Sequence, residues 1–363
     1  MPVNVALGHV SNAFMIAALV IYSLSVVAFA GDFAYGRPRR AAAEARGQQA
    51  QDRATALTAV GAVGSTAAAA AAPGAAEAPA VPGAPADGFV SGVDSMPELA
   101  APPLRAIREA GRWVMTAVAL SAAGVTAQTT AVVTRGLAVH RAPWGNMYEF
   151  VTALTCVAAI FFLFVMIRYR AWSLGVFVMS AVVVTLGLAE TLIYTAAGEL
   201  VPALQSYWLD IHVTAMTLAT GIFFVAAVLG FVYLWVDRYA RRVAAGRAAP
   251  GNGIIRRLPS IEQIDRLTYR TIVFGFPVWT FGVIAGAIWA DQAWGRYWGW
   301  VPVETWAFIT WVLYAAFLHA RATAGWRGRR AHYIQLLGFV SLTFNILVVQ
   351  VFIAGLHSYA GVS

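Results

Sequence analysis

Two histidines and one cluster of tryptophans are the residues of this sequence best suited to chemistry. His212 lies in SYWLDIHV and His357 in LHSYAG, each at the end of a long apolar stretch, and the segment 289–306 reads WADQAWGRYWGWVPVETW. Neutral imidazole is an iron ligand, and a porphyrin needs flat apolar surfaces. The combination predicts a heme b site with His212 and His357 as axial ligands. The rings expected to hold the porphyrin are those of Trp294, Trp298 and Trp300.

A simpler interpretation exists for the same residues. Tryptophans gather at the interface between a membrane and water, where they form an aromatic belt. A histidine at the end of a membrane span can be satisfied by water alone. A belt, however, is spread over many helix ends, whereas these rings are concentrated in one segment.

His319 has a different setting, because it lies within an apolar run. An ionisable side chain inside a membrane span is a candidate functional residue, and the residues three and four positions away from His319 are all small. Small residues also allow close helix packing, which is the alternative. We expect His9, His140 and His332 to lie in loops and to be hydrated. The single cysteine, Cys156, excludes an internal disulfide and a thiol relay.

The elements that must position these residues are membrane spans. The chain is 60% hydrophobic and 12% charged, which indicates an integral membrane protein. We predict an all-α fold of about eight transmembrane helices. The expected spans are 12–30, 113–134, 147–167, 172–195, 212–236, 271–290, 304–321 and 333–355.

The arginines predict the orientation of these spans. With eight spans, 22 of the 25 basic residues fall in loops on one side, and only Arg135, Arg141 and Arg296 fall on the other. Basic residues are retained on the cytoplasmic side, so we expect both termini and the tryptophan-rich loop on the outer side. The positive charge therefore reflects topology, and we expect no nucleic-acid partner.

Three parts are expected along the chain. Residues 1–30 form an N-terminal transmembrane helix, 31–112 an Ala/Pro-rich low-complexity cytoplasmic linker, and 113–361 the transmembrane core. The uncharged alanine-rich stretch 54–72 could be counted as a ninth span, but alanine gains little in lipid, and a ninth span would place an arginine cluster outside. A short surface helix is expected over 259–269.

Five segments together carry a resemblance to a known family. They are PWGNMYEF at 143–150, SYWLDIHV, WGRYWGWVPVETW, ITWVLYAAFLHAR and LHSYAG. In this order they resemble the CcsA-type cytochrome c biogenesis proteins, also called ResC or CcsB, of the tryptophan-rich heme-handling superfamily. The resemblance covers about 113–361, and the N-terminal span fits it more loosely.

The resemblance implies a function and partners. Such proteins work with a ResB/Ccs1-type membrane subunit, carry heme outward across the bacterial cell membrane and present it to apocytochrome c, as part of a holocytochrome c synthase of the system II type. It implies that His212 and His357 are the outer axial ligands and that His319 takes heme within the membrane. The partner histidine of His319 would belong to the other subunit.

One motif departs from the family pattern. The family loop continues Trp-Asp-Pro-Lys-Glu, whereas this chain reads Trp300-Val301-Pro302-Val303-Glu304 and so lacks both the acid and the base. Two other functions remain open from the residues alone. One is a transporter with an aromatic outer gate, which would need polar groups at the midplane of its spans. The other is a structural partner subunit that binds no heme.

Overall fold

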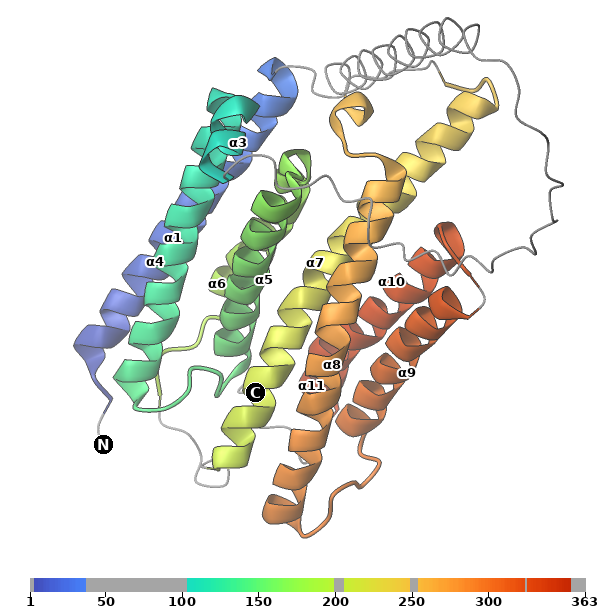
Figure 1. The fold of residues 1–363 in the computed structure, drawn as a ribbon. Helices are drawn as coiled ribbons and strands as arrows, with labels where there is room; N and C mark the ends of the chain where they lie inside the picture. Colours follow the sequence, from blue (N-terminus) through green and yellow to red (C-terminus); the bar gives the residue numbers. More distant parts are fainter. Residues whose placement is uncertain (1–2, 37–102, 199–205, 249–253, 324, 354–363) are drawn as a thin grey trace, which may run out of the picture. The chain divides into compact units, whose positions relative to one another are not determined.

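The part of the chain that the structure describes is a bundle of membrane-spanning helices (Figure 1). The structure, a computed structural model, describes residues 3–36, 103–198, 206–248, 254–323 and 325–353 of the 363. These residues contain helices and no strand, and eight helices are long and apolar enough to cross a membrane. The predicted all-α fold with eight spans is therefore confirmed.

The helices follow the predicted spans in order. They are α1 (Val5–Tyr35), α3 (Pro103–Ala110), α4 (Arg112–Val139), α5 (Met147–Tyr169), α6 (Gly175–Leu192), α7 (Tyr207–Ala244), α8 (Ile261–Trp294), α9 (Pro302–Ala322), α10 (Arg329–Phe344) and α11 (Gln350–Phe352). A π-helical segment, Asn345–Val349, joins α10 to α11. Short 3-10 helices lie at Trp172–Leu174 and Ile255–Arg257.

Two of these helices are much longer than a membrane is thick. With 38 and 34 residues, α7 and α8 extend about 57 and 51 Å, compared with a hydrocarbon core of about 30 Å. The expected surface helix over 259–269 is wrong, because Ile261 begins α8 itself. Ser260 caps that start by accepting a hydrogen bond from the Gln263 amide at 3.2 Å. No glycine or proline follows before residue 275, so the helix continues directly into the span.

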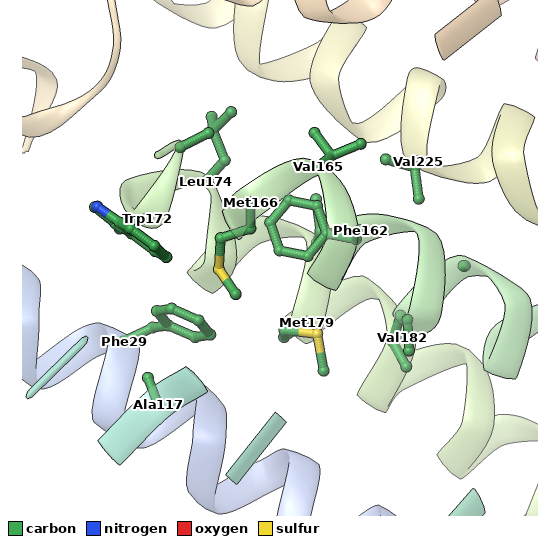
Figure 2. Close-up of a cluster of buried hydrophobic side chains, with 14 of the residues drawn as sticks. Phe29, Ala117, Phe162, Val165, Met166, Trp172, Leu174, Met179, Val182 and Val225 are labelled. Carbon is green, nitrogen blue, oxygen red and sulfur yellow. The ribbon is translucent and has the colours of Figure 1, made fainter. Parts of the chain in front are cut away.

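Two hydrophobic clusters hold the bundle together. One joins α1, α4, α5, α6 and part of α7, and Figure 2 shows its centre, where Phe29 of α1 lies near Met166 and Trp172. The second joins α7 to α8, α9 and α10 around Phe223, whose ring stacks on Tyr314 at a centroid distance of 3.9 Å. Because α7 belongs to both clusters, it connects the two halves of the bundle.

Alternating helix directions bring several chain segments to one end, which we call the tryptophan end and define by the loop 295–301 between α8 and α9. The first helix begins there, since the Asn4 amide donates to the Ala138 carbonyl at the end of α4 at 2.8 Å. The π-helical segment also reaches it, since Asn345 Nδ2 donates to the Val303 carbonyl at 3.1 Å. At the other end of the bundle, α7 finishes in Arg241 and Arg242.

The expected linker over 31–112 lies mostly outside the described residues. Its two ends are helical, since α1 continues to Tyr35 and α3 occupies Pro103–Ala110. The chain divides into two units, residues 1–37 with 106–363, and residues 38–105. All the structural features below belong to the first unit.

Candidate functional site

A cavity at the tryptophan end gathers residues from distant parts of the chain. Its wall takes residues from the start of α5, the start of α7, the last turns of α8, the loop 295–301, the start of α9 and the π-helical segment. Most of the lining side chains are apolar or aromatic. Among the described lining residues, the only ionisable acids and histidines are Asp210, His212 and Glu304, and no arginine is present.

His212 lies at this wall in the second turn of α7. Its Nδ1 is 2.8 Å from the Gly282 carbonyl oxygen of α8. A carbonyl oxygen only accepts hydrogen bonds, so Nδ1 must carry the proton when the ring is neutral. The lone pair then resides on Nε2. In metal-binding histidines, a hydrogen bond of this kind from the ring nitrogen that does not bind the metal fixes the tautomer and the ring orientation.

Two glycines of α8, one helical turn apart, lie where α7 packs closely on α8, and one of them makes room for this imidazole. Gly282 and Gly286 form a small-x-x-x-small pattern, which lets helix backbones approach closely. A Cβ added at Gly286 would lie 2.6 Å from both Cε1 and Nδ1 of His212. The ring therefore rests directly on the α8 backbone, and its position depends on Gly286 having no side chain.

Aromatic rings continue from His212 toward the loop. Trp289 is 3% exposed and lies nearly parallel to the imidazole, with an interplanar angle of 9° and centroids 6.5 Å apart. Trp294 packs edge-on against Trp289 at 4.7 Å, and both Trp294 and Trp298 line the cavity. Trp300 does not line it and is 66% exposed. Its backbone has φ 54°, which a bulky residue rarely adopts.

The loop is held by the residues at its two ends and by one hydrogen bond to a side chain of α9. Gly295 ends α8 in the left-handed conformation with φ 69°, and Pro302 occupies the first turn of α9. Val301 occupies the N-cap position and supplies no side-chain cap. The buried Glu304 instead accepts the Gly299 amide through Oε2 at 2.8 Å. This bond fixes the segment that presents Trp298 to the cavity.

Several polar atoms in the cavity wall have no protein partner. Within the described part of the chain, buried polar atoms of lining side chains that make no hydrogen bond include Trp144 Nε1, Thr220 Oγ1, Trp279 Nε1, Trp298 Nε1 and Asn345 Oδ1. Buried polar atoms are normally satisfied by protein, water or ligand. The wall is therefore apolar over most of its area, with isolated donors and acceptors that remain open to a ligand.

A buried ion-pair network supports the rim beside the cavity, and the sequence did not reveal it. Glu149 is 1% exposed and is contacted by Arg135 at 3.1 Å and by Arg141 at 2.8 Å. Its Oε2 also accepts the Gly145 amide at 2.9 Å, and the Asn146 side chain caps α5 by accepting the Glu149 amide. Arg135 and Arg141 were two of the three exceptions in the arginine distribution. Their pairing with a buried carboxylate explains why they are tolerated at this end.

Comparison with known proteins identifies the chain. A profile of the cytochrome c assembly protein family matches residues 144–357, which include His212, the loop 295–301 and all the cavity residues named above. The chain belongs to this family. It is a CcsA-type cytochrome c biogenesis protein, and three CcsA proteins illustrate the similarity. Those of Heterosigma akashiwo and Guillardia theta are 35% identical over 245 residues and 37% identical over 231, each covering 60% of this chain and 76% of its relative. That of Gloeobacter violaceus is 33% identical over 297 residues, covering 67% of this chain and 86% of the relative.

The other predicted ligands of this CcsA-type protein are not part of the described cavity. His357 falls outside the described residues. His319 lies near the end of α9 and is exposed. Fifteen residues separate it from Glu304 on the same helix, which corresponds to about 22 Å along the axis. The structure therefore brings His212, Trp294 and Trp298 together and places His319 toward the opposite end of the bundle.

The expectation for His332 is wrong. His332 lies in α10, is 0% exposed and stacks on Tyr233 with ring centroids 3.7 Å apart. Its Nε2 is 3.1 Å from Asp265 Oδ1, and Asp265 also accepts two hydrogen bonds from Arg321, at 2.7 and 2.9 Å. His9 is likewise in a helix, α1, although it is exposed, whereas His140 lies in a turn as expected.

Proposed function

We propose that this CcsA-type protein binds heme in the cavity at the tryptophan end and presents it for attachment to apocytochrome c. His212 would supply a nitrogen ligand to the heme iron, and Trp294 and Trp298 would contact the porphyrin. The chain acts as one subunit of a holocytochrome c synthase with a ResB/Ccs1-type membrane protein. This proposal goes beyond membership of the family, because it assigns a ligand and a role to particular residues.

The environment of His212 is the observation that carries the proposal. A hydrated histidine at a helix end needs neither a fixed tautomer nor a particular ring plane. Here Nδ1 carries the proton and donates it to the Gly282 carbonyl at 2.8 Å, and Trp289, which also lines the cavity, lies nearly parallel to the ring. Nε2 is thus left as a lone-pair donor at the wall of an apolar cavity, which is the arrangement that axial iron ligation requires.

The rest of the cavity wall suits a flat ligand with one polar edge. Apolar and aromatic side chains supply most of the surface, while the indole N–H groups of Trp144, Trp279 and Trp298 can donate to carboxylate oxygens. The enclosed volume of about 220 Å³ is smaller than the ~300–1,000 Å³ of common ligand pockets. A porphyrin would therefore also occupy the open side, where Tyr297 is 61% exposed. When bound, heme supplies the vinyl groups to which the cysteine thiols of apocytochrome c add.

The two remaining histidines complete the proposed path. His357 is proposed as the second outer ligand, on the resemblance alone. His319 is proposed to receive heme within the membrane together with a histidine of the partner subunit. Its exposure on α9 supports this role, since a side chain shared between subunits must face outward from its own bundle. The arginine distribution supports placing the tryptophan end on the outer side of the membrane. We propose that this membrane is the cell membrane of a bacterium.

The proposal is tested on the complex of this chain with its partner subunit. We expect the wild type to retain heme with a six-coordinate low-spin spectrum, and His212→Ala to lose both the spectrum and most of the heme. His319→Ala should lower total heme, while the turn variant His140→Ala should match the wild type. Cytochrome c maturation in the same cells should fall with His212→Ala. If the complex retains no heme in any form, this chain is a structural subunit instead.

A further inference from the structure

A long apolar groove runs along the outside of the bundle, away from the cavity. It has a volume of about 680 Å³ and is lined by residues of α5, α7 and α8. Both α5 and α8 pack on α7, so α7 forms the floor and the other two helices form the walls (Figure 1). Phe161 of α5 and Phe274 of α8 stack across it with ring centroids 5.9 Å apart. No acidic residue occurs among its described lining residues.

One end of the groove is polar and positively charged. Tyr169, the last residue of α5, and Arg270 of α8 both line it there. The guanidinium of Arg270 lies 5.7 Å from the centre of the Tyr169 ring, and that of Arg168 lies 5.4 Å from it. Two positive charges thus flank a phenol at the end where α7 finishes in arginines. The remainder of the lining is apolar apart from Thr271.

The length of the groove matches one leaflet of a bilayer. From Val157 to Tyr169 it follows twelve residues of α5, which is about 18 Å. Half of a hydrocarbon core is about 15 Å. Val157 therefore lies near the bilayer midplane when the arginines lie at the interface. An acyl chain anchored at the interface would contact lining residues over about this length.

We propose that this groove binds an anionic phospholipid, with its phosphate at Arg168 and Arg270 and one acyl chain along α7. Arginine pairs well with phosphate oxygens, and basic pockets between transmembrane helices bind acidic head groups. The positive charge of the rim favours a head group with net negative charge over a zwitterionic one. The site is separate from the heme cavity, and neither Arg168 nor Arg270 has a role in the proposed heme chemistry.

Lipid retained by the purified complex tests the head-group part. We expect native mass spectrometry to show phosphatidylglycerol bound in preference to phosphatidylcholine. One basic residue near the interface contributes about fivefold to such binding, so Arg168→Gln with Arg270→Gln should lower phosphatidylglycerol affinity by about 30-fold. The control pair is Arg170→Gln with Arg266→Gln, since both side chains are exposed, neither lines the groove and neither lies over the Tyr169 ring as Arg168 and Arg270 do. Equal losses in the two pairs, or equal binding of the two lipids, would overturn the proposal.

The acyl-chain part needs a second measurement. Ile160 lines the groove and is 44% exposed, so a photoreactive residue there should cross-link to lipid in the intact complex. Ile160→Trp should narrow the groove and reduce retained phosphatidylglycerol while leaving bound heme unchanged. A cross-link to the partner subunit in place of lipid would assign the groove to a subunit interface and refute the lipid site.

Discussion

Adding one methyl group at Gly286 should displace the proposed iron ligand. A Cβ at this position would lie 2.6 Å from Cε1 and Nδ1 of His212. The optimal separation of two non-bonded carbon atoms is at least about 3.5 Å. The imidazole or the α8 backbone must therefore move by about 1 Å. Movement of the ring lengthens its 2.8 Å hydrogen bond to the Gly282 carbonyl. The proton is then no longer held on Nδ1.

The size of this effect follows from the role of the Gly282 carbonyl. Loss of the hydrogen bond that orients a metal-binding histidine lowers metal affinity about 10–100-fold, which corresponds to about 1.4–2.8 kcal/mol. We expect Gly286→Ala to weaken heme binding by this amount. The expected spectrum has a reduced low-spin component, because a misplaced imidazole leaves one coordination position open.

Gly282→Ala is the matched control. Its added Cβ would meet the flexible thioether of Met216 at 2.6 Å and Ala215 Cβ at 3.3 Å, so it disturbs the same helix contact without touching the imidazole. The main-chain carbonyl that accepts from His212 is retained. Heme titration of both variants, in complex with the partner subunit, measures the difference. Equal heme affinity in Gly286→Ala and wild type, or equal losses in both variants, would refute the reasoning.

Three further predictions concern the tryptophan loop, the buried ion-pair network and the membrane topology. Trp298→Ala should reduce heme retention more than Trp300→Ala, as measured by the heme-to-protein ratio, because Trp298 lines the cavity and Trp300 is 66% exposed; equal effects would contradict this placement. Glu149→Gln should destabilise the folded protein by about 3–5 kcal/mol, since it leaves Arg135 buried without its carboxylate. The control Asp237→Asn removes the surface ion pairs with Arg241 and Arg329 and should change stability by about 0–1 kcal/mol, so similar shifts in melting temperature would argue against the network. A periplasmic reporter fused at residue 80 should be inactive and one after Ser363 active, and the reverse result would overturn the proposed topology.

The sequence predicted the spans because hydropathy and length suffice for them. It also singled out His212 and the tryptophans, because few residue types bind iron or stack on a flat ligand. It did not predict how His212 is held. That contact joins α7 to α8 across 70 residues and depends on the crossing point of the two helices. From the sequence, Trp300 was grouped with Trp298 because the two residues are close together in it. The sequence does not show that the backbone at Trp300 has φ 54°.

The buried polar groups were harder to predict than the apolar ones. His332 follows a run of arginines, which favours a hydrated loop, yet its partner Asp265 lies 67 positions earlier at the start of α8. Glu149 was visible within a recognised segment, but its pairing with Arg135 and Arg141 depends on the turn before α5. The signal that could have predicted this network is a carboxylate at the start of a span, on the side of the membrane where Arg135 and Arg141 are exceptions to the arginine distribution.

Chemical rescue of the His212 ligand tests the central claim most directly. His212→Gly removes the imidazole and leaves a space beside Gly286, so the complex with the partner subunit should lose its six-coordinate low-spin heme spectrum. Added imidazole should enter this space and restore both the spectrum and the retained heme, whereas the control His140→Gly should need no rescue. A His212→Gly complex with the wild-type spectrum and heme content in the absence of imidazole would contradict the assignment of His212 as a ligand.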